Sequence, residues 1–403
     1  MLRSISLISK RSNSSSSAAL LKTPLYESHL ALGGKMVPYA GFEMPVLYKD
    51  QSHIQSHNWV RANCGLFDVS HMLQHNFSGP SAKALLEKIT PIDLASLPVN
   101  SSSLTVLLNN EGGIIDDCII TKHGEEQFYM VTNAGCREKD VKFIKQEISS
   151  LQGDLNHNTF EGTLLAVQGP KSKEILQKFV SDFDLNKLTF GQTKFNKFNS
   201  IIDSEVHIAR SGYTGEDGFE LSIASSNDVE TKQAQDFFNL LISEYPEVVK
   251  PIGLAARDSL RLEAGMCLYG YELNESITPI EASLAWLIPK ARRTPDLATF
   301  NGSSKILSQL SDRSLVSHQR VGITSKGPAP RDSSSKIFDK SGAEIGYITS
   351  GSPSPTLGGN VAQGYVKRGS HKSGTEIDIE IRGKKRPGVI SKMPFVPNNF
   401  FRG

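Results

Sequence analysis

The chain has 403 residues, of which 38% are hydrophobic and 21% charged, and its formal net charge is +2. This length exceeds what one hydrophobic core organises and predicts two or three domains of a globular protein. The balanced charge argues against a nucleic-acid partner, the lack of a long apolar run argues against a membrane span, and the four scattered cysteines argue against a zinc site, an iron–sulfur cluster or a disulfide framework.

Residues 1–22 have the composition of a mitochondrial presequence. They contain four basic residues, many serines and spaced leucines and isoleucines, and the first acid in the chain is Glu27. A secretory signal fits less well because the segment has no continuous apolar stretch. Without these four cations the formal charge of the remainder is −2, so the mild basicity belongs to the predicted targeting segment.

The stretch Phe67–Met72 alternates between apolar and polar residues, which is typical of a half-buried strand. A strand here would place Asp68, Ser70 and Met72 on one face. His71 would lie on the other face, where a structural role is a simpler interpretation than a catalytic one.

Two segments of the chain, 79–89 and 169–179, resemble each other. Each starts with Gly-Pro and continues with apolar residues at helical spacing, which predicts a turn and a helix that begins with proline. Nearly the same offset relates the two hairpins that are predicted downstream, at 118–132 and around 215–217. A further helix is predicted after each hairpin, over 138–148 and over 228–242. The middle of the chain is therefore predicted to contain a duplicated β-α-β-β-α unit in an α+β fold.

Two adjacent acids, Asp116 and Asp117, lie in the otherwise apolar stretch Gly112–Ile120, which predicts a turn followed by a strand. Because neighbouring strand residues face opposite sides, only one of the acids can lie in a given pocket, and the other should meet solvent or a neighbouring backbone. A buried carboxylate on an apolar strand is costly without a partner, which favours a functional interpretation. Such a group can hold a cation, orient an amine or transfer a proton, and the pattern leaves these alternatives open.

The nine residues Gly212–Glu220 combine three glycines, three carboxylates and a phenol. Alternating apolar residues before and after them predict two strands joined by a glycine-rich loop. Glu220 would then face away from Phe219 and Leu221. A carboxylate fixed there can accept two parallel N–H groups of a flat heterocycle. The alternative is a solvated acidic turn on an outer hairpin.

Residues 254–264 are predicted to form a helix that ends at Gly265. Arg257 and Arg261 are four residues apart and share a face of this helix. Arg257 can bind a carbonyl or carboxylate group of a ligand, and an intrahelical salt bridge is the equally plausible alternative.

The pattern changes after residues 288–302, which contain prolines and basic residues and are predicted to be a linker. Short β-rich pieces then recur between glycines, prolines and serines, at 320–323, 344–349, 361–366 and 375–381. Residues 303–403 are therefore predicted to form an all-β domain, either a barrel or a sandwich. The α+β region before the linker would cover residues 23–287.

From about Thr23 to the C-terminus the sequence resembles the aminomethyltransferase, or T-protein, of the glycine cleavage system. The resemblance rests on a series of motifs in the same order: Thr23–Tyr26, Gly33–Val37, Phe67–Met72, Gly112–Asp117, Asn133–Cys136, Gly212–Glu220, Gly253–Gly265 and Ser391–Pro397. It implies a three-domain cloverleaf in which the duplicated region forms two interleaved α+β domains and a C-terminal β-barrel follows.

The resemblance also implies an enzyme of the mitochondrial matrix. Enzymes of this family act on the aminomethyl group that is carried as a thioether on the lipoyl arm of H-protein. They transfer its methylene to tetrahydrofolate, a co-substrate, and yield 5,10-methylenetetrahydrofolate, ammonia and dihydrolipoyl H-protein. Lipoylated H-protein and the P-protein and L-protein of the system would be the partners, and neither nucleic acid, a membrane nor a metal is expected.

The family's catalytic aspartate falls on Asp117, the second of the two adjacent acids. This assignment agrees with the chemistry, because loss of ammonia from an N–C–S centre leaves an electron-poor methylene group. A nearby carboxylate stabilises the developing positive charge and can orient or deprotonate the attacking folate amine.

The resemblance assigns folate contacts to Glu220 and Arg257, with Tyr213 beside the pterin. Met72 and Phe400 are assigned to the same folate site, and the C-terminal tail that contains Phe400 would close it. Phe400 lacks the hydroxyl group that relatives such as the animal enzymes carry at this position. A stacking contact is therefore expected from Phe400 without the hydrogen bond of that hydroxyl.

Two other families are alternatives. The folate-binding half of a sarcosine or dimethylglycine dehydrogenase follows a flavin domain, and no such domain fits before residue 23. A folate-binding iron–sulfur cluster assembly factor of the same fold has a Lys-Gly-Cys-Tyr-x-Gly-Gln-Glu signature, which Gly265–Glu272 matches only in part. The complete turn Gly215–Gly218 favours the transferase. The absence of dinucleotide, P-loop and nucleophile-elbow motifs argues against flavin binding, nucleotide hydrolysis and serine hydrolase chemistry.

Overall fold

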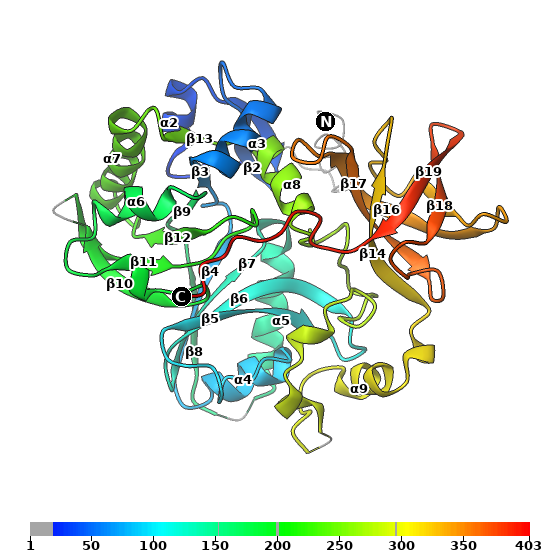
Figure 1. Cartoon of the computed structure of the whole chain (residues 1–403). Coiled ribbons are helices and arrows are strands. Elements are labelled where there is room, and N and C mark those ends of the chain that lie inside the picture. The colour runs from blue at the N-terminus through cyan, green and yellow to red at the C-terminus, as the bar shows by residue number, and fades with distance from the viewer. Residues whose placement is uncertain (1–18, 152, 199–200, 295) are drawn as a thin grey trace. The chain divides into compact units, whose positions relative to one another are not determined.

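The computed structural model describes residues 19–151, 153–198, 201–294 and 296–403, which form two compact units (Figure 1). Unit 1 contains the described residues of Met1–Gln74 and Thr159–Arg261 together with Pro397–Gly403, and unit 2 contains His75–Asn158 and Leu262–Val396. Most of the predicted presequence, residues 1–18, lies outside the described residues. Leu21, near its end, pairs with Phe42.

The larger sheet of unit 1 has six strands. Their order is β10 (Thr193–Phe198), β11 (Ile202–Ala209), β12 (Gly218–Ile223), β9 (Thr163–Gln168), β3 (Cys64–Asp68) and β13 (Val249–Pro251). Helices α6 (Ser172–Gln177) and α7 (Asp228–Glu244) pack on this sheet (Figure 1). Phe219 and Leu221 of β12 are fully buried in the core that these elements share, as the predicted alternation requires.

Most other elements of unit 1 come from its N-terminal segment. It contains α2 (Tyr26–Ala31), the hairpin of β1 (Lys35–Tyr39) and β2 (Phe42–Leu47), and α3 (His53–Ala62). Helix α3 starts with a capping box between Ser52 and Gln55, which satisfies two backbone donors at its N-terminus. Helix α8 (Leu254–Glu263) ends before Gly265, whose φ of +70° favours glycine, and the helix prediction for 254–264 is confirmed.

Unit 2 contains a five-stranded sheet. Its order is β5 (Ser101–Leu108), β6 (Ile114–Gly124), β7 (Gln127–Thr132), β4 (Leu73–Ser78) and β8 (Asn156–Phe160). Buried side chains of α4 (Ala82–Ile89), such as Leu85, and of α5 (Arg137–Ser149), such as Ile144, belong to the same core as the inward side chains of this sheet. The hairpin and the two helices that the sequence predicted here are therefore confirmed.

The strand orders confirm the internal duplication. The sets β5-β6-β7-β4 and β10-β11-β12-β9 occupy equivalent positions in the two sheets. Each copy contains one strand more than predicted, β5 or β10, so the repeated unit is β-α-β-β-β-α. Both extra strands lie at sheet edges, where polar residues such as Ser101–Ser103 weaken the apolar alternation that marks an inner strand.

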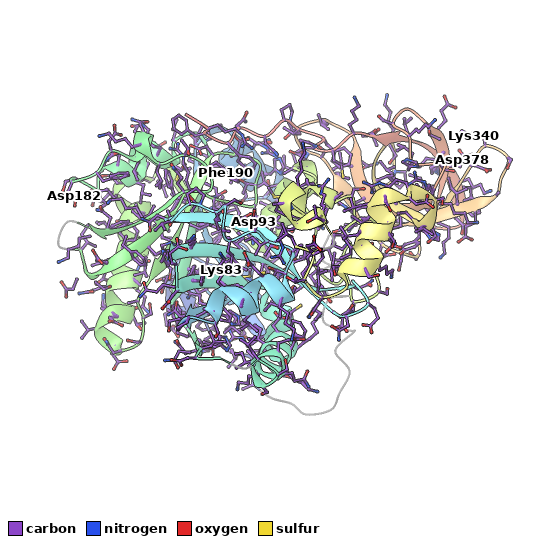
Figure 2. The ribbon with its side chains drawn as sticks, turned by 90° about the horizontal axis from the view of Figure 1, so that it is seen from below. Lys83, Asp93, Asp182, Phe190, Lys340 and Asp378 are labelled. Carbon is purple, nitrogen blue, oxygen red and sulfur yellow. The ribbon has the colours of Figure 1, made fainter. Side chains whose placement is uncertain are left out.

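The C-terminal β region is a closed six-stranded barrel and not a sandwich. Its strands follow the order β14 (His318–Ser325), β17 (Asn360–Lys367), β16 (Glu344–Pro353), β15 (Lys336–Phe338), β18 (Glu376–Ile381) and β19 (Lys384–Ser391). The sequence did not predict β15, which has only three residues, or β19, which starts with exposed polar residues. Lys340 and Asp378 form an ion pair of 2.9 Å on this barrel (Figure 2).

Short helices connect the barrel to the sheet of unit 2 along the chain. They are η3 (Ala285–Leu287), η4 (Lys290–Arg293), α9 (Ser303–Ser311) and η5 (Arg313–Leu315). In the part of the chain that the structure describes, no helix is both long and apolar enough to cross a membrane. All four cysteines are free thiols.

The prediction of a strand over Phe67–Met72 was wrong beyond Asp68, where β3 ends. The backbone N–H of Ser70 donates to the Asp68 carboxylate at 2.9 Å, and the N–H of Met72 donates to the carbonyl oxygen of Val69 at 3.1 Å. These bonds form a turn, so Met72 does not continue the face of Asp68. His71 is 3% exposed and its ring packs edge-on against Tyr39. Its structural role stays a prediction.

Asp68 joins the N-terminal segment to the central sheet of unit 1. Its buried carboxylate accepts hydrogen bonds from the Thr23 hydroxyl at 2.6 Å and from His29 Nε2 at 2.8 Å, and the Tyr48 hydroxyl is hydrogen-bonded to His29 Nδ1 at 2.9 Å. Burial alone would raise the pKa of Asp68, but the donors from His29, Ser70 and Thr23 lower this pKa to about 2. The carboxylate is therefore ionised and well paired in the fold.

We expect Asp68→Ala to lower the free energy of unfolding by about 3–5 kcal/mol, because His29 and Thr23 then lose a buried acceptor. Urea unfolding measures this loss, with Glu205→Ala at an exposed position of β11 as the control that should change by less than about 0.5 kcal/mol. The lowered pKa means that the contribution of Asp68 is complete above its ordinary pKa of 3.8 and disappears as the pH falls towards 2. Equal effects of the two substitutions would contradict this role.

Candidate active site

The turn between β11 and β12 is held by two arginine–carboxylate pairs. Arg61 Nη1 lies 2.9 Å from the Glu216 carboxylate, and Arg210 Nε lies 3.0 Å from the Asp217 carboxylate. Arg210 is 2% exposed and also donates to two backbone carbonyl oxygens, so its charge is well compensated. Gly215 adopts a φ of +80° within the turn. Glu216 and Asp217 therefore shape the loop, which leaves Glu220 as its outward carboxylate.

The C-terminal tail of unit 1 is fastened to the same turn. The Asn399 backbone N–H donates to the carbonyl oxygen of Gly215 at 2.7 Å, and its side-chain amide donates to Glu216 at 2.9 Å. The guanidinium carbon of Arg210 lies 4.1 Å from the centre of the Phe401 ring. These contacts fix residues 399–401 against the loop that precedes Glu220.

Phe400 stacks on Phe190, with 4.1 Å between the ring centres and 19° between the planes (Figure 2 labels Phe190). Met72 is partly exposed in the turn that follows β3. Both side chains belong to unit 1, on segments separate from β12 and α8. Their predicted folate contacts stay predictions.

Glu220, Arg257 and Tyr213 form the charged part of the candidate site in unit 1. Glu220 lies on β12 opposite the buried side chains of Phe219 and Leu221 and keeps partial exposure. Burial raises the pKa of Glu220, while the positive charge of Arg257 and a hydrogen bond from Ser211 lower it. An ionised Glu220 thus depends on its cationic neighbour.

Arg257 projects from α8 and faces Tyr213. Its guanidinium carbon lies 4.7 Å from the centre of the Tyr213 ring, which is a cation–π distance. Asp258, the next residue of the helix, accepts a hydrogen bond of 3.0 Å from Arg261 instead. The intrahelical salt bridge that was the alternative for Arg257 therefore belongs to Arg261. An aromatic ring, a carboxylate and a guanidinium that meet in this way suit a flat ligand with several N–H groups.

The two adjacent acids lie on β6 in unit 2. Asp116 is fully buried and accepts hydrogen bonds from the backbone N–H and side-chain amide of Asn133, both at 2.9 Å. Asp117 keeps partial exposure, and the same Asn133 amide lies 3.0 Å from its carboxylate. Both acids therefore contact Asn133, although strand alternation predicted that they would have separate surroundings.

Asp117 has the properties of a proton-transfer group. Burial raises its pKa to about 7, the negative charge of Asp116 is the second cause, and the Asn133 amide acts in the opposite direction. A carboxylate with a pKa near neutrality can gain or lose a proton at the working pH. Asn133 lies in one of the motifs that carry the family resemblance, but the sequence gives no sign of its role, because an amide side chain has neither a charge nor a pKa in the working range.

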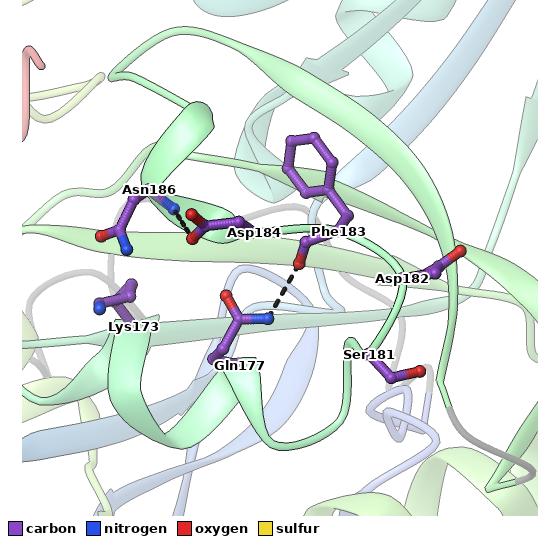
Figure 3. Close-up of a pocket in the computed structure, with 7 residues that line it drawn as sticks. All are labelled: Lys173, Gln177, Ser181, Asp182, Phe183, Asp184 and Asn186. Carbon is purple, nitrogen blue, oxygen red and sulfur yellow. Dashed lines mark hydrogen bonds between the residues drawn. The ribbon is translucent and has the colours of Figure 1, made fainter.

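A surface depression of 410 Å³ lies elsewhere in unit 1 (Figure 3). It is formed by α6 and the segment that leads to η2 (Leu185–Lys187), and its lining consists of Lys173, Gln177, Ser181, Asp182, Phe183, Asp184 and Asn186. Gln177 donates to the backbone of Phe183, and the backbone N–H of Asn186 donates to Asp184. None of the predicted site residues lines this depression, so it is not the candidate site.

Two family models match the chain. The model described as the GCVT N-terminal domain matches residues 25–292, and the glycine cleavage T-protein C-terminal barrel domain matches residues 318–397. The second match coincides with the six-stranded barrel.

Curated relatives match over nearly the whole length. The mitochondrial aminomethyltransferase of Saccharomyces cerevisiae is 49% identical and covers 98% of both chains. The mitochondrial aminomethyltransferase of Pisum sativum is 46% identical and covers 95% of this chain and 91% of the relative. Among solved structures, the glycine cleavage system aminomethyltransferase T from Bartonella henselae superimposes with a TM-score of 0.86 at 36% identity, over 95% of this chain and 100% of the other.

Proposed function

The chain belongs to the glycine cleavage T-protein family and is an aminomethyltransferase of the glycine cleavage system, and we propose that Asp117 is its catalytic carboxylate and that Glu220 and Arg257 bind tetrahydrofolate. The match of relatives over nearly the full length supports the activity. The convergence of Glu220, Arg257 and Tyr213 is the structural observation that carries the assignment of the folate contacts.

The reaction exchanges the bonds of one carbon atom. The methylene carbon of the aminomethyl group loses its bonds to nitrogen and sulfur and gains two bonds to the folate nitrogens. Nitrogen leaves as ammonia, and sulfur returns to the lipoyl arm of H-protein as a thiol. No electrons are gained or lost overall, so the enzyme has to place the reactants, stabilise charge and move protons.

We propose that Asp117 acts on the cationic stage of this exchange. Departure of ammonia leaves positive charge on the methylene carbon and its remaining heteroatom, and an adjacent carboxylate lowers the energy of that state. Because the pKa of Asp117 is raised to about 7, the same group can take a proton from the folate amine as the new bond forms.

Glu220 and Arg257 are proposed to recognise the pterin of tetrahydrofolate. A carboxylate accepts two parallel N–H groups, which match the edge of the reduced pterin ring better than the mixed donor and acceptor of an amide. Arg257 keeps Glu220 ionised and offers N–H donors of its own. Tyr213, Met72 and Phe400 are proposed to supply apolar contacts to the same ligand.

The protein is mitochondrial, like the relatives that it matches. We propose that it acts in the matrix with lipoylated H-protein and the P-protein and L-protein of the system, and that residues 1–22 are its presequence. The folate-binding region 23–287, the linker 288–302 and the barrel domain 303–403 are proposed as its functional domains.

Purified protein supplied with aminomethylated H-protein and tetrahydrofolate is expected to release ammonia and form 5,10-methylenetetrahydrofolate in equal amounts. Ammonia release and the absorbance of a coupled methylenetetrahydrofolate dehydrogenase measure the two products. A reaction without tetrahydrofolate serves as the control. No folate-dependent turnover would rule out the proposed activity.

Asp117→Asn is expected to lower kcat by about a hundredfold or more, because it removes the charge and keeps the shape of the side chain. Folate affinity should stay close to that of the wild type, and Glu126→Gln in the exposed β6–β7 turn is the matched control. The wild-type rate should fall as the pH drops through about 7, where Asp117 takes up a proton, and the variant should lose this limb. An unchanged rate in Asp117→Asn would move the catalytic role to another group.

Glu220→Gln is expected to weaken the binding of tetrahydrofolate by about tenfold or more, because one charge-assisted hydrogen bond is replaced by an amide that presents a donor to a donor. Calorimetric or fluorescence titration measures the affinity. Glu205→Gln, an exposed carboxylate on the neighbouring strand β11, controls for the loss of a negative charge. The same affinity in Glu220→Gln and the wild type would contradict the pterin contact.

A further inference from the structure

A third acid of unit 2, Asp140, lies close to Asp116, the first of the two acids of β6. It belongs to the first turn of α5 and is fully buried. One oxygen of Asp140, one oxygen of Asp116 and the sulfur of Cys136 lie within 4.8 Å of one another. Among the described residues neither carboxylate oxygen of Asp140 has a hydrogen-bond donor in bonding geometry.

The two carboxyl groups of this pair have different surroundings. Asp116 receives two N–H donors from Asn133, one on each oxygen, which stabilise its ionised form. Neither oxygen of Asp140 has a partner in bonding geometry, and the nearby Thr132 side chain lowers the pKa of Asp140 less than burial raises it, so its ionised form is costly. Two carboxylates this close cannot both be ionised in a low-dielectric site, so one proton has to be present.

We propose that Asp140 holds this proton and donates it to Asp116, and that Asp140 is thereby a positioning residue which keeps Asp116 ionised next to Asp117. No bond other than the O–H···O contact forms, and no other reactant is needed. The link to catalysis rests on the proposed function of Asp117. The presence of the proton on Asp140 does not depend on that function.

Several titratable or polar groups of unit 2 face this pair. They are Asp117 and Cys118 on β6, Thr132 on β7, Cys136 in η1 (Ala134–Cys136), Lys139 on α5, His75 on β4 through Thr132, and Tyr269, Glu272 and Glu275 in the segment after α8. Arg137 of α5 lies close enough to His75 to lower its pKa.

Lys139 is the cation that acts on the pair, but its ammonium group is occupied elsewhere. It donates to the carbonyl oxygen of Ile115 and to the Tyr269 hydroxyl, both at 2.6 Å, and it lies 3.3 Å from the Glu275 carboxylate. Its charge lowers the pKa of Asp140 less than burial and the charge of Asp116 raise it, and that pKa reaches about 10. The charges around Asp140 therefore agree with a carboxylic acid at neutral pH.

The pair has a direct effect on Asp117. The ionised Asp116 is the second cause, after burial, of the raised pKa of Asp117. If Asp116 took up a proton itself, that repulsion would vanish and the pKa of Asp117 would fall. By donating a hydrogen bond, Asp140 keeps Asp116 ionised. The charge of Asp116 in turn keeps the pKa of the catalytic carboxylate, Asp117, near neutrality.

A cation bound between Asp116, Asp140 and Cys136 is the competing occupant. Against it, both Asp116 oxygens already accept hydrogen bonds, and burial raises the pKa of the Cys136 thiol, which disfavours the thiolate that a metal would require. Elemental analysis of the full-length protein decides between the two: one bound cation per chain that Asp140→Asn abolishes would overturn the proposal.

The first experiment compares the stability of the wild type and Asp140→Asn at several pH values, and it needs no activity. The unfolded chain releases the Asp140 proton above its ordinary pKa of 3.8, while the folded wild type keeps it. The folding constant of the wild type relative to the variant should therefore fall about tenfold per pH unit between roughly pH 5 and 9. A ratio that does not change with pH would show that Asp140 is ionised and would overturn the proposal.

The second experiment measures the pH dependence of kcat/KM in Asp140→Asn and Asp140→Ala. The amide of the asparagine still donates to Asp116, so the acidic limb near pH 7 should stay in place. Alanine removes one hydrogen-bond donor from Asp116, which favours the protonated form of Asp116 and weakens its repulsion of Asp117, so the limb should move to lower pH. If the acidic limb lay at the same pH in both variants, or if both lost the same fraction of the rate at every pH, Asp140 would have only a packing role and the proposal would be overturned.

An infrared measurement on the wild type covers the case in which Asp140→Ala does not fold. The carbonyl stretch of a protonated, buried carboxylic acid should be present at about pH 9, where Asp117 with its pKa of about 7 is ionised, and absent in Asp140→Asn. The two outcomes separate the proposals: the band together with an inactive enzyme would refute the function of Asp117 and retain the proton, and its absence would refute the proton on Asp140 whatever the activity.

Discussion

The cost of removing an ionised group from water controls the chemistry of both units. A buried carboxylate is stable only with donors, a counter-ion or a proton, and the structure uses all three solutions. Asp68 collects hydrogen-bond donors, Asp217 pairs with Arg210, and the close pair of Asp116 and Asp140 requires a proton. Charged neighbours set the pKa values of the two partly exposed acids. Asp116 raises the pKa of Asp117, and Arg257 lowers the pKa of Glu220.

The duplication supplies the framework for this chemistry and leaves the two copies free to differ. Both copies use the same strand order, so each offers a hairpin at the same place in its sheet. Asp117 lies on the first strand of its hairpin, whereas Glu220 lies on the second strand of the other. The repeated scaffold therefore fixes where strands run, and single residues decide which strand carries the acid.

Inner strands, amphipathic helices and the glycine-rich turn could be predicted from the sequence because each follows a local periodicity. The turn spacing predicted an all-β domain, either a barrel or a sandwich, and the family resemblance implied the barrel. Strand β15 is too short to show alternation, and β5 and β10 lie at sheet edges where polar residues are tolerated. The strand prediction at Phe67–Met72 failed because the Asp68 carboxylate binds the backbone of Ser70 and starts a turn, a contact that alternation does not encode. Asn133 and Asp140 could not be given roles, since their meaning depends on partners that only the fold brings close.

The last seven residues of the chain belong to unit 1, although the barrel and most of unit 2 separate them from it in sequence. The six strands of the larger sheet of unit 1 all come from residues 64–251, so residues 397–403 return to this unit from a distant part of the sequence. In the turn before Glu220, Gly215 accepts a hydrogen bond from Asn399, and Arg210 beside this turn contacts the ring of Phe401. A chain that lacks Asn399 and Phe401 would therefore keep the strands of the six-stranded sheet, while the turn before Glu220 would lose the partners that these two residues provide.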